Sequence, residues 1–263
     1  MNPYFSIIIP TLNEAKFLPD LLKDLSHQTN QDFETIIVDG QSKDHTQAKA
    51  ESFRTKLPSL SILSTTKHNV SYQRNLGAKK AQGKILLFLD ADGGLPPFFL
   101  DGIKYKLSKN PVDVFTSWIK PDSTNPQDTA IATIINLSFE ASRLLDIPTG
   151  FGAMLGFKKT AFAKLRGFAE DITYAEDQEI IRRALEKKLT FTIYPDPHYV
   201  YSFRRLRKQG TLNTLRQFAK LQTKLAIAGY PNHTKKDYPM GGHYFKPDKQ
   251  KPTILDKIKQ LLA

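Results

Sequence analysis

The chain of 263 residues contains no cysteine. This absence excludes disulfide bridges, thiolate zinc sites, iron–sulfur clusters and a cysteine nucleophile. Long apolar runs are also missing: no stretch approaches the roughly 20 residues of a membrane-spanning helix, and the apolar residues 5–9 are too few for a secretory signal. We therefore expect a cytoplasmic protein that does not span the membrane, with a core that needs no metal or disulfide for stability.

Acidic residues are scarce in the last quarter of the chain. Residues 203–263 carry 14 basic and 3 acidic side chains, whereas residues 1–202 carry 24 basic and 23 acidic side chains. The net charge of +12 is therefore almost entirely a property of the C-terminal part. We interpret the chain as a nearly neutral body, residues 1–202, followed by a basic extension, residues 203–263, and we consider their functions separately.

Short apolar runs alternate with helix-like segments in the first half of the body. The runs are nearly continuous, as in strands that are buried on both faces. They cover residues 5–9, 35–38, 61–63 and 85–89, and the helix-like segments between them cover residues 15–27, 45–55 and 71–82. This alternation predicts an α/β fold with a mostly parallel central sheet that is flanked by helices.

The pattern loosens in the second half of the body. It predicts helices at 98–107, 129–145 and 175–187, strands at 112–117 and 154–157, and a loop at 121–128. We divide the body into residues 1–118 and residues 119–202, the second being a smaller unit appended to the sheet.

Three of the predicted strands end in polar, partly acidic loops. These loops begin at Pro10, at Asp39 and at Asp90-Ala91-Asp92. Because ligands bind beyond the carboxyl ends of parallel strands, we expect the loops to converge on one site. Two carboxylates one residue apart can hold a divalent cation, although an isolated Asp-x-Asp is commonly only a surface turn.

Arg74 opens the helix that leads into the strand before Asp90. An aspartate on a base or ribose, an arginine on phosphate and an aspartate on a metal together describe a nucleoside-diphosphate site. Each residue also has a structural interpretation, since Asp39-Gly40 is a common turn and Arg74 can be a solvated helix residue. Their joint occurrence at successive strand ends favours the ligand site.

A series of motifs runs through the body in a fixed order. The motifs are Pro10-Thr11-Leu12-Asn13-Glu14, Val38-Asp39-Gly40-Gln41-Ser42-Lys43-Asp44-x-Thr46, Arg74-Asn75-x-Gly77-Ala78 with Ala81-x-Gly83, Leu89-Asp90-Ala91-Asp92, Gly152-Ala153-Met154, Gly167-Phe168, Glu176-Asp177 and Arg182-Arg183. As a set, from residue 4 to about residue 187, they resemble the family 2 glycosyltransferases, which have the GT-A fold. The sequence after Ser202 takes no part in the resemblance.

The resemblance implies a role for each matching residue. Nucleotide-sugar contacts are implied for Pro10, Thr11, Glu14, Asp39, Arg74, Asp90, Ala91 and Gly152. Asp92 matches the aspartate that binds the metal bridging the diphosphate, and Asp177 matches the catalytic base of inverting members. Gln41 stands where the family usually has a second Asp or Glu, so the nucleotide base stays open.

The activity implied by the resemblance is a metal-dependent, inverting transfer of a sugar from a nucleotide-diphosphate donor. Glycans and lipid-linked molecules are the implied acceptors, through a hydroxyl or a lipid phosphate. Mn²⁺ or Mg²⁺ neutralises the departing diphosphate, and Asp177 removes the acceptor proton. A role at the start of its helix is the alternative for Asp177. His198 and His243 are candidates for a further metal ligand, against the commoner surface or core roles of histidine.

Two basic amphipathic segments, residues 212–228 and 253–263, end the chain. Either they pack on the body, or they lie on an anionic membrane at its inner face and bring the enzyme to a lipid-linked acceptor. Arg204 and Arg205 are candidates for diphosphate contacts.

Two other classes of protein remain as alternatives. A nucleotidyltransferase that makes sugar nucleotides normally has a Gly-rich, basic loop after the first strand, and residues 10–14 are neither. A nucleic-acid-binding protein explains the basic extension, but the body has no aromatic RNA-binding motif, zinc-ligand spacing or recognition-helix signature. We therefore expect no nucleic-acid partner.

Overall fold

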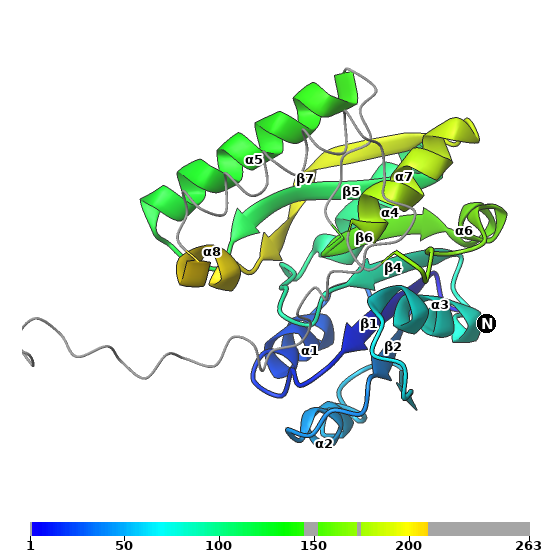
Figure 1. Cartoon of the computed structure of the whole chain (residues 1–263), viewed down its shortest axis with the longest axis vertical. Helices are drawn as coiled ribbons and strands as arrows, with labels where there is room; N and C mark the ends of the chain where they lie inside the picture. Colours follow the sequence, from blue (N-terminus) through cyan, green and yellow to red (C-terminus); the bar gives the residue numbers. More distant parts are fainter. Residues whose placement is uncertain (1, 145–151, 173–174, 210–263) are drawn as a thin grey trace, which may run out of the picture.

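The computed structural model describes residues 2–144, 152–172 and 175–209. Within these ranges one sheet has the strand order β3-β2-β1-β4-β6-β5-β7 (Figure 1). Its strands are β1 (Phe5–Thr11), β2 (Phe33–Asp39), β3 (Leu60–Ser64), β4 (Ile85–Leu89), β5 (Val114–Pro121), β6 (Met154–Lys158) and β7 (Phe191–Tyr201). Only β6 runs antiparallel to its neighbours among these strands, which confirms the predicted, mostly parallel sheet.

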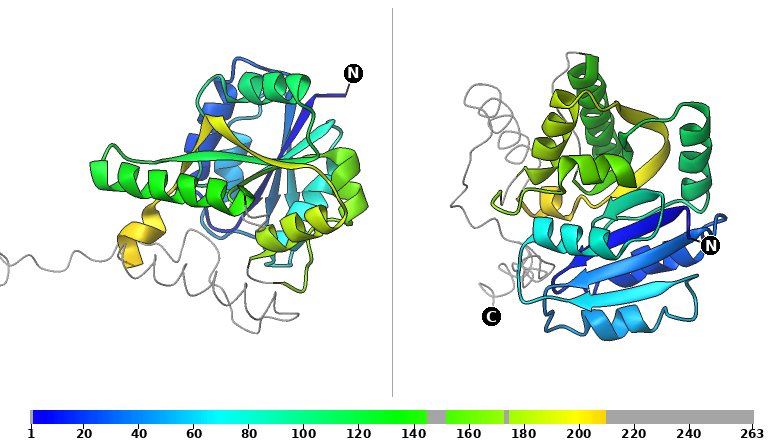
Figure 2. Two further views of the ribbon diagram at one scale, coloured as in Figure 1. Left: turned by 90° about the horizontal axis from the view of Figure 1, so that it is seen from above. Right: turned by 90° about the vertical axis from the view of Figure 1, so that its right-hand side faces the viewer.

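Helices cover both faces of the sheet (Figure 2). One face packs against α1 (Leu18–Ser26), α2 (Thr46–Glu51), α4 (Phe99–Lys109) and α5 (Pro126–Leu144). The other face packs against α3 (Val70–Lys80), α6 (Lys159–Leu165) and α7 (Glu176–Glu186). The helix α8 (Arg204–Gln209) follows β7, and its Leu206 joins the core of the first face.

The two cores explain why the apolar runs of the sequence fold as they do. All residues of β1 and β2 are buried, as expected for strands covered on both sides. In α1, four leucines at helical spacing (Leu18, Leu21, Leu22 and Leu25) have no exposed surface. Each contributes about 1.5–3 kcal/mol through burial of its side chain. The hydrophobic pattern of the sequence therefore places the sheet and its first helices.

The structure corrects the sequence-based boundaries in the second half of the body. The helix α6 was not predicted. The strand β5 extends to Pro121, and α5 begins at Pro126, so half of the predicted loop 121–128 is regular structure. Proline is tolerated in the first turn of a helix, where its missing N–H has no partner to lose. Figure 1 shows α5 lying along β5 and β7.

No helix in the described ranges is long and apolar enough to cross a membrane.

Candidate functional site

The loops after β1, β2 and β4 meet at the carboxyl edge of the sheet, as the sequence predicted. Thr11 and Asp39 are direct partners in the register of β1 and β2. Asp39 is fully buried and accepts hydrogen bonds from Thr11 Oγ1 (2.9 Å), from the Ser42 backbone N–H (2.9 Å) and from Gln47 Nε2 (2.7 Å). The carboxylate of Asp39 therefore organises the loop after β2 from inside the protein.

Hydrogen bonds join the loop after β1 to the loop after β2. The Asn13 N–H donates to Ser42 Oγ (2.8 Å), and the Lys43 N–H donates to Asn13 Oδ1 (2.8 Å). The Glu14 N–H donates to Thr46 Oγ1 (2.9 Å). Asn13, Ser42 and Thr46 carried no assigned role in the sequence analysis, although all three lie inside the quoted motifs. Their side chains hold Glu14 at the edge of the site.

Arg204 places a positive charge between two carboxylates. Its Nε lies 2.8 Å from Asp92 Oδ2, and its two terminal nitrogens lie 3.2 and 3.3 Å from the oxygens of Glu14. The guanidinium also lies over the Phe17 ring, 4.4 Å from its centroid. Glu14, Asp92 and Arg204 are thus brought together from the loops after β1 and β4 and from the start of α8.

The carboxylates of this site repel one another. Burial raises the pKa of Glu14 to about 7, with further increases from Asp92 and Asp90, while Arg204 acts to lower it. Although 39% of the Asp90 side chain is exposed, the surrounding protein raises its pKa to about 6 against the lowering effect of Arg74. Asp92 adds to the increase at Asp90. The site therefore gathers Glu14, Asp90 and Asp92 around the cations Arg204 and Arg74.

The donor chemistry of this site fits a hard divalent cation. Carboxylate oxygens are the ligands that Mg²⁺ and Mn²⁺ prefer. The Asp92 carboxylate already forms an ion pair with a cationic side chain, Arg204, at 2.8 Å. In the part of the chain that the structure describes, no three His, Asp or Glu side chains form a complete metal site. A metal at Asp92 would therefore need oxygens from a bound diphosphate or from water.

Arg74 connects the two halves of the body. Its side chain is only 2% exposed. One terminal nitrogen lies 2.8 Å from Glu176 Oε1, and the other donates to Asp90 Oδ1 (3.0 Å) and to the Gly152 carbonyl (2.8 Å). These contacts hold the guanidinium inside the protein, where it positions Asp90, Glu176 and the Gly152 carbonyl.

Asp177 lies in the first turn of α7, beside Gly152. The Gly152 N–H donates to Asp177 Oδ2 (2.6 Å), and the Gln178 N–H donates to Oδ1 (2.8 Å). A helix N-terminus ordinarily favours an ionised carboxylate. Burial and the neighbouring charge of Glu176 nevertheless raise the pKa of Asp177 to about 7. A carboxylate with this pKa is well matched to a general base near neutral pH.

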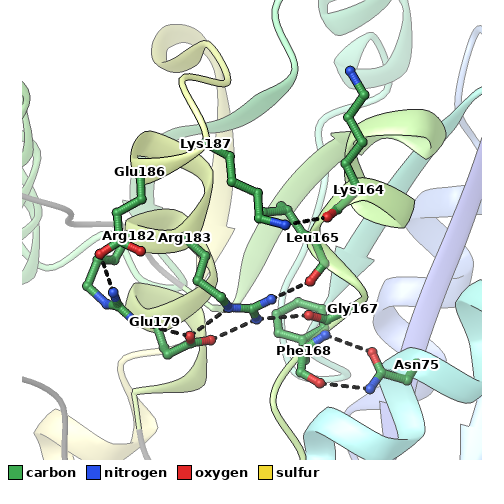
Figure 3. A network of polar contacts seen from close by, with 10 residues as sticks. All are labelled: Asn75, Lys164, Leu165, Gly167, Phe168, Glu179, Arg182, Arg183, Glu186 and Lys187. Carbon is green, nitrogen blue, oxygen red and sulfur yellow. Dashed lines mark hydrogen bonds and ion pairs between the residues drawn. The ribbon is translucent and has the colours of Figure 1, made fainter.

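A polar network fixes α7 against the rest of the body (Figure 3). Arg183 Nε lies 2.6 Å from Glu179, and another Arg183 nitrogen donates to the Gly167 carbonyl (2.8 Å). Asn75 of α3 exchanges two hydrogen bonds with the Phe168 backbone, both 2.9 Å long. Gly167 has a φ of +78°, and a Cβ there would lie 2.5 Å from Asn75 Oδ1. The network therefore requires glycine at this turn and holds the start of α7 in place.

Of the two candidate histidines, His198 lies within the described residues, and its contacts there do not include Asp92. His198 lies in β7 with its ring 6.2 Å from the Trp118 ring, and burial and Lys120 lower its pKa. The next residue, Tyr199, lies against Gly93, where a Cβ would be 2.6 Å from the tyrosine ring. His243 lies outside the described residues.

Tyr201 is a residue of the site that the sequence analysis missed. Burial raises the pKa of Tyr201, and Asp92, Asp90 and Asp177 raise it further, whereas Arg205 lowers it. Tyr201 therefore lies within electrostatic reach of Asp92 and Asp177. The sequence signal was the aromatic alternation of Tyr199, Tyr201 and Phe203 at the end of β7.

The remaining predicted contacts, Pro10 and Ala91, are buried where β1 ends and where the turn after β4 begins. Fold and site together describe an α/β protein with one carboxylate centre in its strand-end loops and a second at the start of α7. A family model, Glycosyl transferase family 2, matches residues 6–166. The chain belongs to this family, as the sequence resemblance predicted.

Two curated relatives match over most of the chain. An uncharacterized glycosyltransferase of Haemophilus influenzae is 28% identical over 192 residues, which are 72% of this chain and 64% of that protein. The poly(ribitol-phosphate) beta-N-acetylglucosaminyltransferase TarS of Staphylococcus aureus is 29% identical over 212 residues, which are 76% of this chain and 36% of TarS. The chain thus spans less than two thirds of the length of either relative.

Solved structures share the fold. TarS 1–349 in complex with UDP-GlcNAc has a TM-score of 0.62 and 23% identity, covering 77% of this chain and 58% of that one. The mannosyltransferase PcManGT of Pyrobaculum calidifontis, in complex with GDP-Man and Mn²⁺, has a TM-score of 0.63 and 20% identity, covering 88% and 70%. These similarities confirm the predicted GT-A fold.

Proposed function

We propose that the chain is a metal-dependent, inverting glycosyltransferase that moves a sugar from a nucleotide-diphosphate donor to an acceptor hydroxyl. The observation that carries the proposal is the bridge from Arg74 to Asp90 and to Glu176. It joins the aspartate pair after β4 to the Glu176-Asp177 pair at the start of α7. Donor and acceptor chemistry thereby share one site. Family membership favours this activity over nucleotidyl transfer or nucleic-acid binding.

The donor half of the proposed reaction belongs to the loops after β1, β2 and β4. Asp39 and the Thr11 to Glu14 loop shape the place for the nucleoside, and Asp92 would hold Mn²⁺ or Mg²⁺. When bound, such a metal acts as a Lewis acid that neutralises the charge of the departing diphosphate. Arg74 orients Asp90 through a 3.0 Å hydrogen bond to its carboxylate.

The acceptor half depends on Asp177. The ionised carboxylate accepts the proton of the acceptor hydroxyl as that oxygen forms its bond to the anomeric carbon. The bond between this carbon and the diphosphate oxygen breaks in the same displacement, so the configuration inverts. The N–H groups of Gly152 and Gln178 hold the carboxylate in a fixed orientation, which contributes to catalysis because the base needs no reorganisation.

Donor binding provides the first experiment. Thermal shifts would be recorded with UDP-, GDP- and dTDP-sugars, with and without Mn²⁺. A ligand that binds only the native state raises its stability in proportion to the logarithm of concentration over Kd. We expect one nucleotide class to stabilise the protein, and to do so more strongly with Mn²⁺. No stabilisation by any of these donors would contradict the proposal.

We propose the acceptor class and the cellular location of the enzyme separately from its reaction. We infer a glycan or lipid-linked acceptor and contact of the basic extension with an anionic membrane. The segments 212–228 and 253–263 lie outside the described residues. Two arginines of α8 already form ion pairs with the body. Arg204 pairs with Glu14 and Asp92, whereas Arg207 pairs with Asp122 and Asp128. Vesicle sedimentation should show binding that depends on anionic lipid, and binding indifferent to lipid charge would contradict the inference.

A further inference from the structure

The contact between Arg204 and Asp92 occupies the carboxylate that the proposed function assigns to a metal. Arg204 Nε lies 2.8 Å from Asp92 Oδ2, and the side chains of Arg204 and Asp92 are only 18% and 16% exposed. The same guanidinium reaches both oxygens of Glu14 and lies over Phe17. Arg204 is therefore a well-defined partner of this carboxylate.

We propose that Arg204 is an exchangeable counter-cation: it neutralises Asp92 and Glu14 while the donor site is empty, and it leaves Asp92 for the donor diphosphate when a divalent metal binds there. The inference rests on the proposed function and deepens it. It assigns Arg204 a positioning role that couples metal binding to diphosphate binding.

Charge gives the reason for the exchange. A guanidinium and a divalent cation on one carboxylate repel each other, and a partly buried site screens that repulsion poorly. An incoming diphosphate changes the balance, because it brings negative charge and because the planar guanidinium forms two parallel hydrogen bonds to phosphate oxygens. In the absence of nucleotide, Arg204 and the metal compete for Asp92. In its presence, both cations are accommodated.

The anchoring of α8 lets the Arg204 side chain move without unfolding the helix. Arg207, one turn further on, lies 2.7 Å from Asp122 and 3.1 Å from Asp128. The Phe203 N–H donates to Asp122 (3.0 Å), and Leu206 is buried in the core. Arg207 lies on the same short helix as Arg204 but pairs with carboxylates outside the site. It therefore provides a matched control.

The experiment compares the full-length wild type with Arg204→Gln and Arg207→Gln. Binding of Mn²⁺ alone is measured by electron paramagnetic resonance of the free ion, and binding of UDP and GDP at saturating Mn²⁺ is measured by calorimetry. Arg204→Gln should bind Mn²⁺ at least about five-fold more tightly than the wild type, because a competing cation is gone. The same variant should bind the nucleoside diphosphate at least about five-fold more weakly at saturating Mn²⁺, because a charged hydrogen bond is lost. Arg207→Gln should change neither affinity.

Two further variants keep the test decisive. Arg204→Lys retains the charge and should show a smaller change in the same directions, which also covers the case in which Arg204→Gln folds poorly. Adding Asp92→Asn to Arg204→Gln should abolish the gain in Mn²⁺ affinity. Unchanged or weaker Mn²⁺ binding in both Arg204 variants would overturn the exchange, as would an equal gain in Arg207→Gln. Failure of the wild type to bind any nucleotide would instead refute the proposed function.

Discussion

Replacing Arg74 with glutamine should destabilise the protein and disorder both halves of the site. Arg74 is 2% exposed and holds Glu176 at 2.8 Å and Asp90 at 3.0 Å. Removal of one partner from a buried ion pair costs about 3–5 kcal/mol, because the other charge is left uncompensated. The lower end applies here, since 39% of the Asp90 side chain is exposed and can regain water. We therefore expect a loss of about 3 kcal/mol at pH 8.

The loss should depend on pH in a defined direction. Burial raises the pKa of Asp90 to about 6 and of Asp177 to about 7, and Arg74 opposes both increases. Without Arg74 these folded-state pKa values move further above the unfolded values. A carboxyl group with a raised folded pKa binds more protons in the native state, so it destabilises the native state increasingly as pH rises. The difference between variant and wild type should be smaller at pH 5 than at pH 8.

Urea unfolding of both proteins, followed by circular dichroism at the two pH values, measures this loss. Arg54→Gln is the matched control, because its i,i+3 pair with Glu51 is about half exposed and should contribute less than about 0.5 kcal/mol. A loss at pH 8 no larger than that of the control would refute the assignment of Arg74 as a buried electrostatic tie. A loss that grew towards pH 5 would refute the explanation of the pKa values.

Three further predictions concern Asp177 as the base, the turn at Gly167, and His198. The base must be ionised, so kcat/KM should rise with pH through about 7, the pKa of Asp177; a flat profile from about pH 5.5 to 9 would count against Asp177. Gly167→Ala should lower the free energy of unfolding by about 1–2 kcal/mol or more, because φ is +78°; an unchanged urea midpoint would contradict this. His198→Ala should leave the Mn²⁺ dependence of donor binding unchanged in thermal-shift titrations, and a lost dependence would restore His198 as a metal ligand.

The convergence of the strand-end loops could be predicted from sequence because it depends on local patterns. Buried parallel strands appear as continuous apolar runs, and the residues that follow them must meet at one edge of the sheet. The acidic pair Glu176-Asp177 could also be predicted from the sequence, because it stands at the start of a segment whose apolar residues have helical spacing. In these cases, neighbouring residues in the sequence carried the information.

The contacts of Arg204 could not be predicted in this way. Arg204 and Glu14 are 190 positions apart in the chain, and no spacing rule relates residues at that distance. A cluster of arginines is usually solvated, and the sequence made Arg204 and Arg205 candidates for diphosphate contacts only. The burial of Arg74 was hidden for the same reason: only the folded structure places Asp90, Glu176 and the Gly152 carbonyl around one guanidinium.

The short helix α6 and the inward position of Tyr201 were missed for a different reason. Residues 159–165 are few, and their helical pattern cannot be told from a turn. At the end of β7, alternating aromatic residues define two faces, but the register of β7 beside β5 includes an irregularity between Ser117 and Ile119. A shift of one residue exchanges the faces of a strand, so only the structure shows which aromatic residues reach the site.

The central claim is that the site separates donor binding at Asp92 from proton removal at Asp177. Its most direct test is a comparison of Asp177→Asn with Asp92→Asn for two properties: metal-dependent nucleotide binding and sugar transfer. We predict that Asp177→Asn abolishes transfer and leaves nucleotide binding nearly intact, whereas Asp92→Asn loses the effect of Mn²⁺ on binding. Turnover of more than a few per cent of wild type in Asp177→Asn would contradict the account.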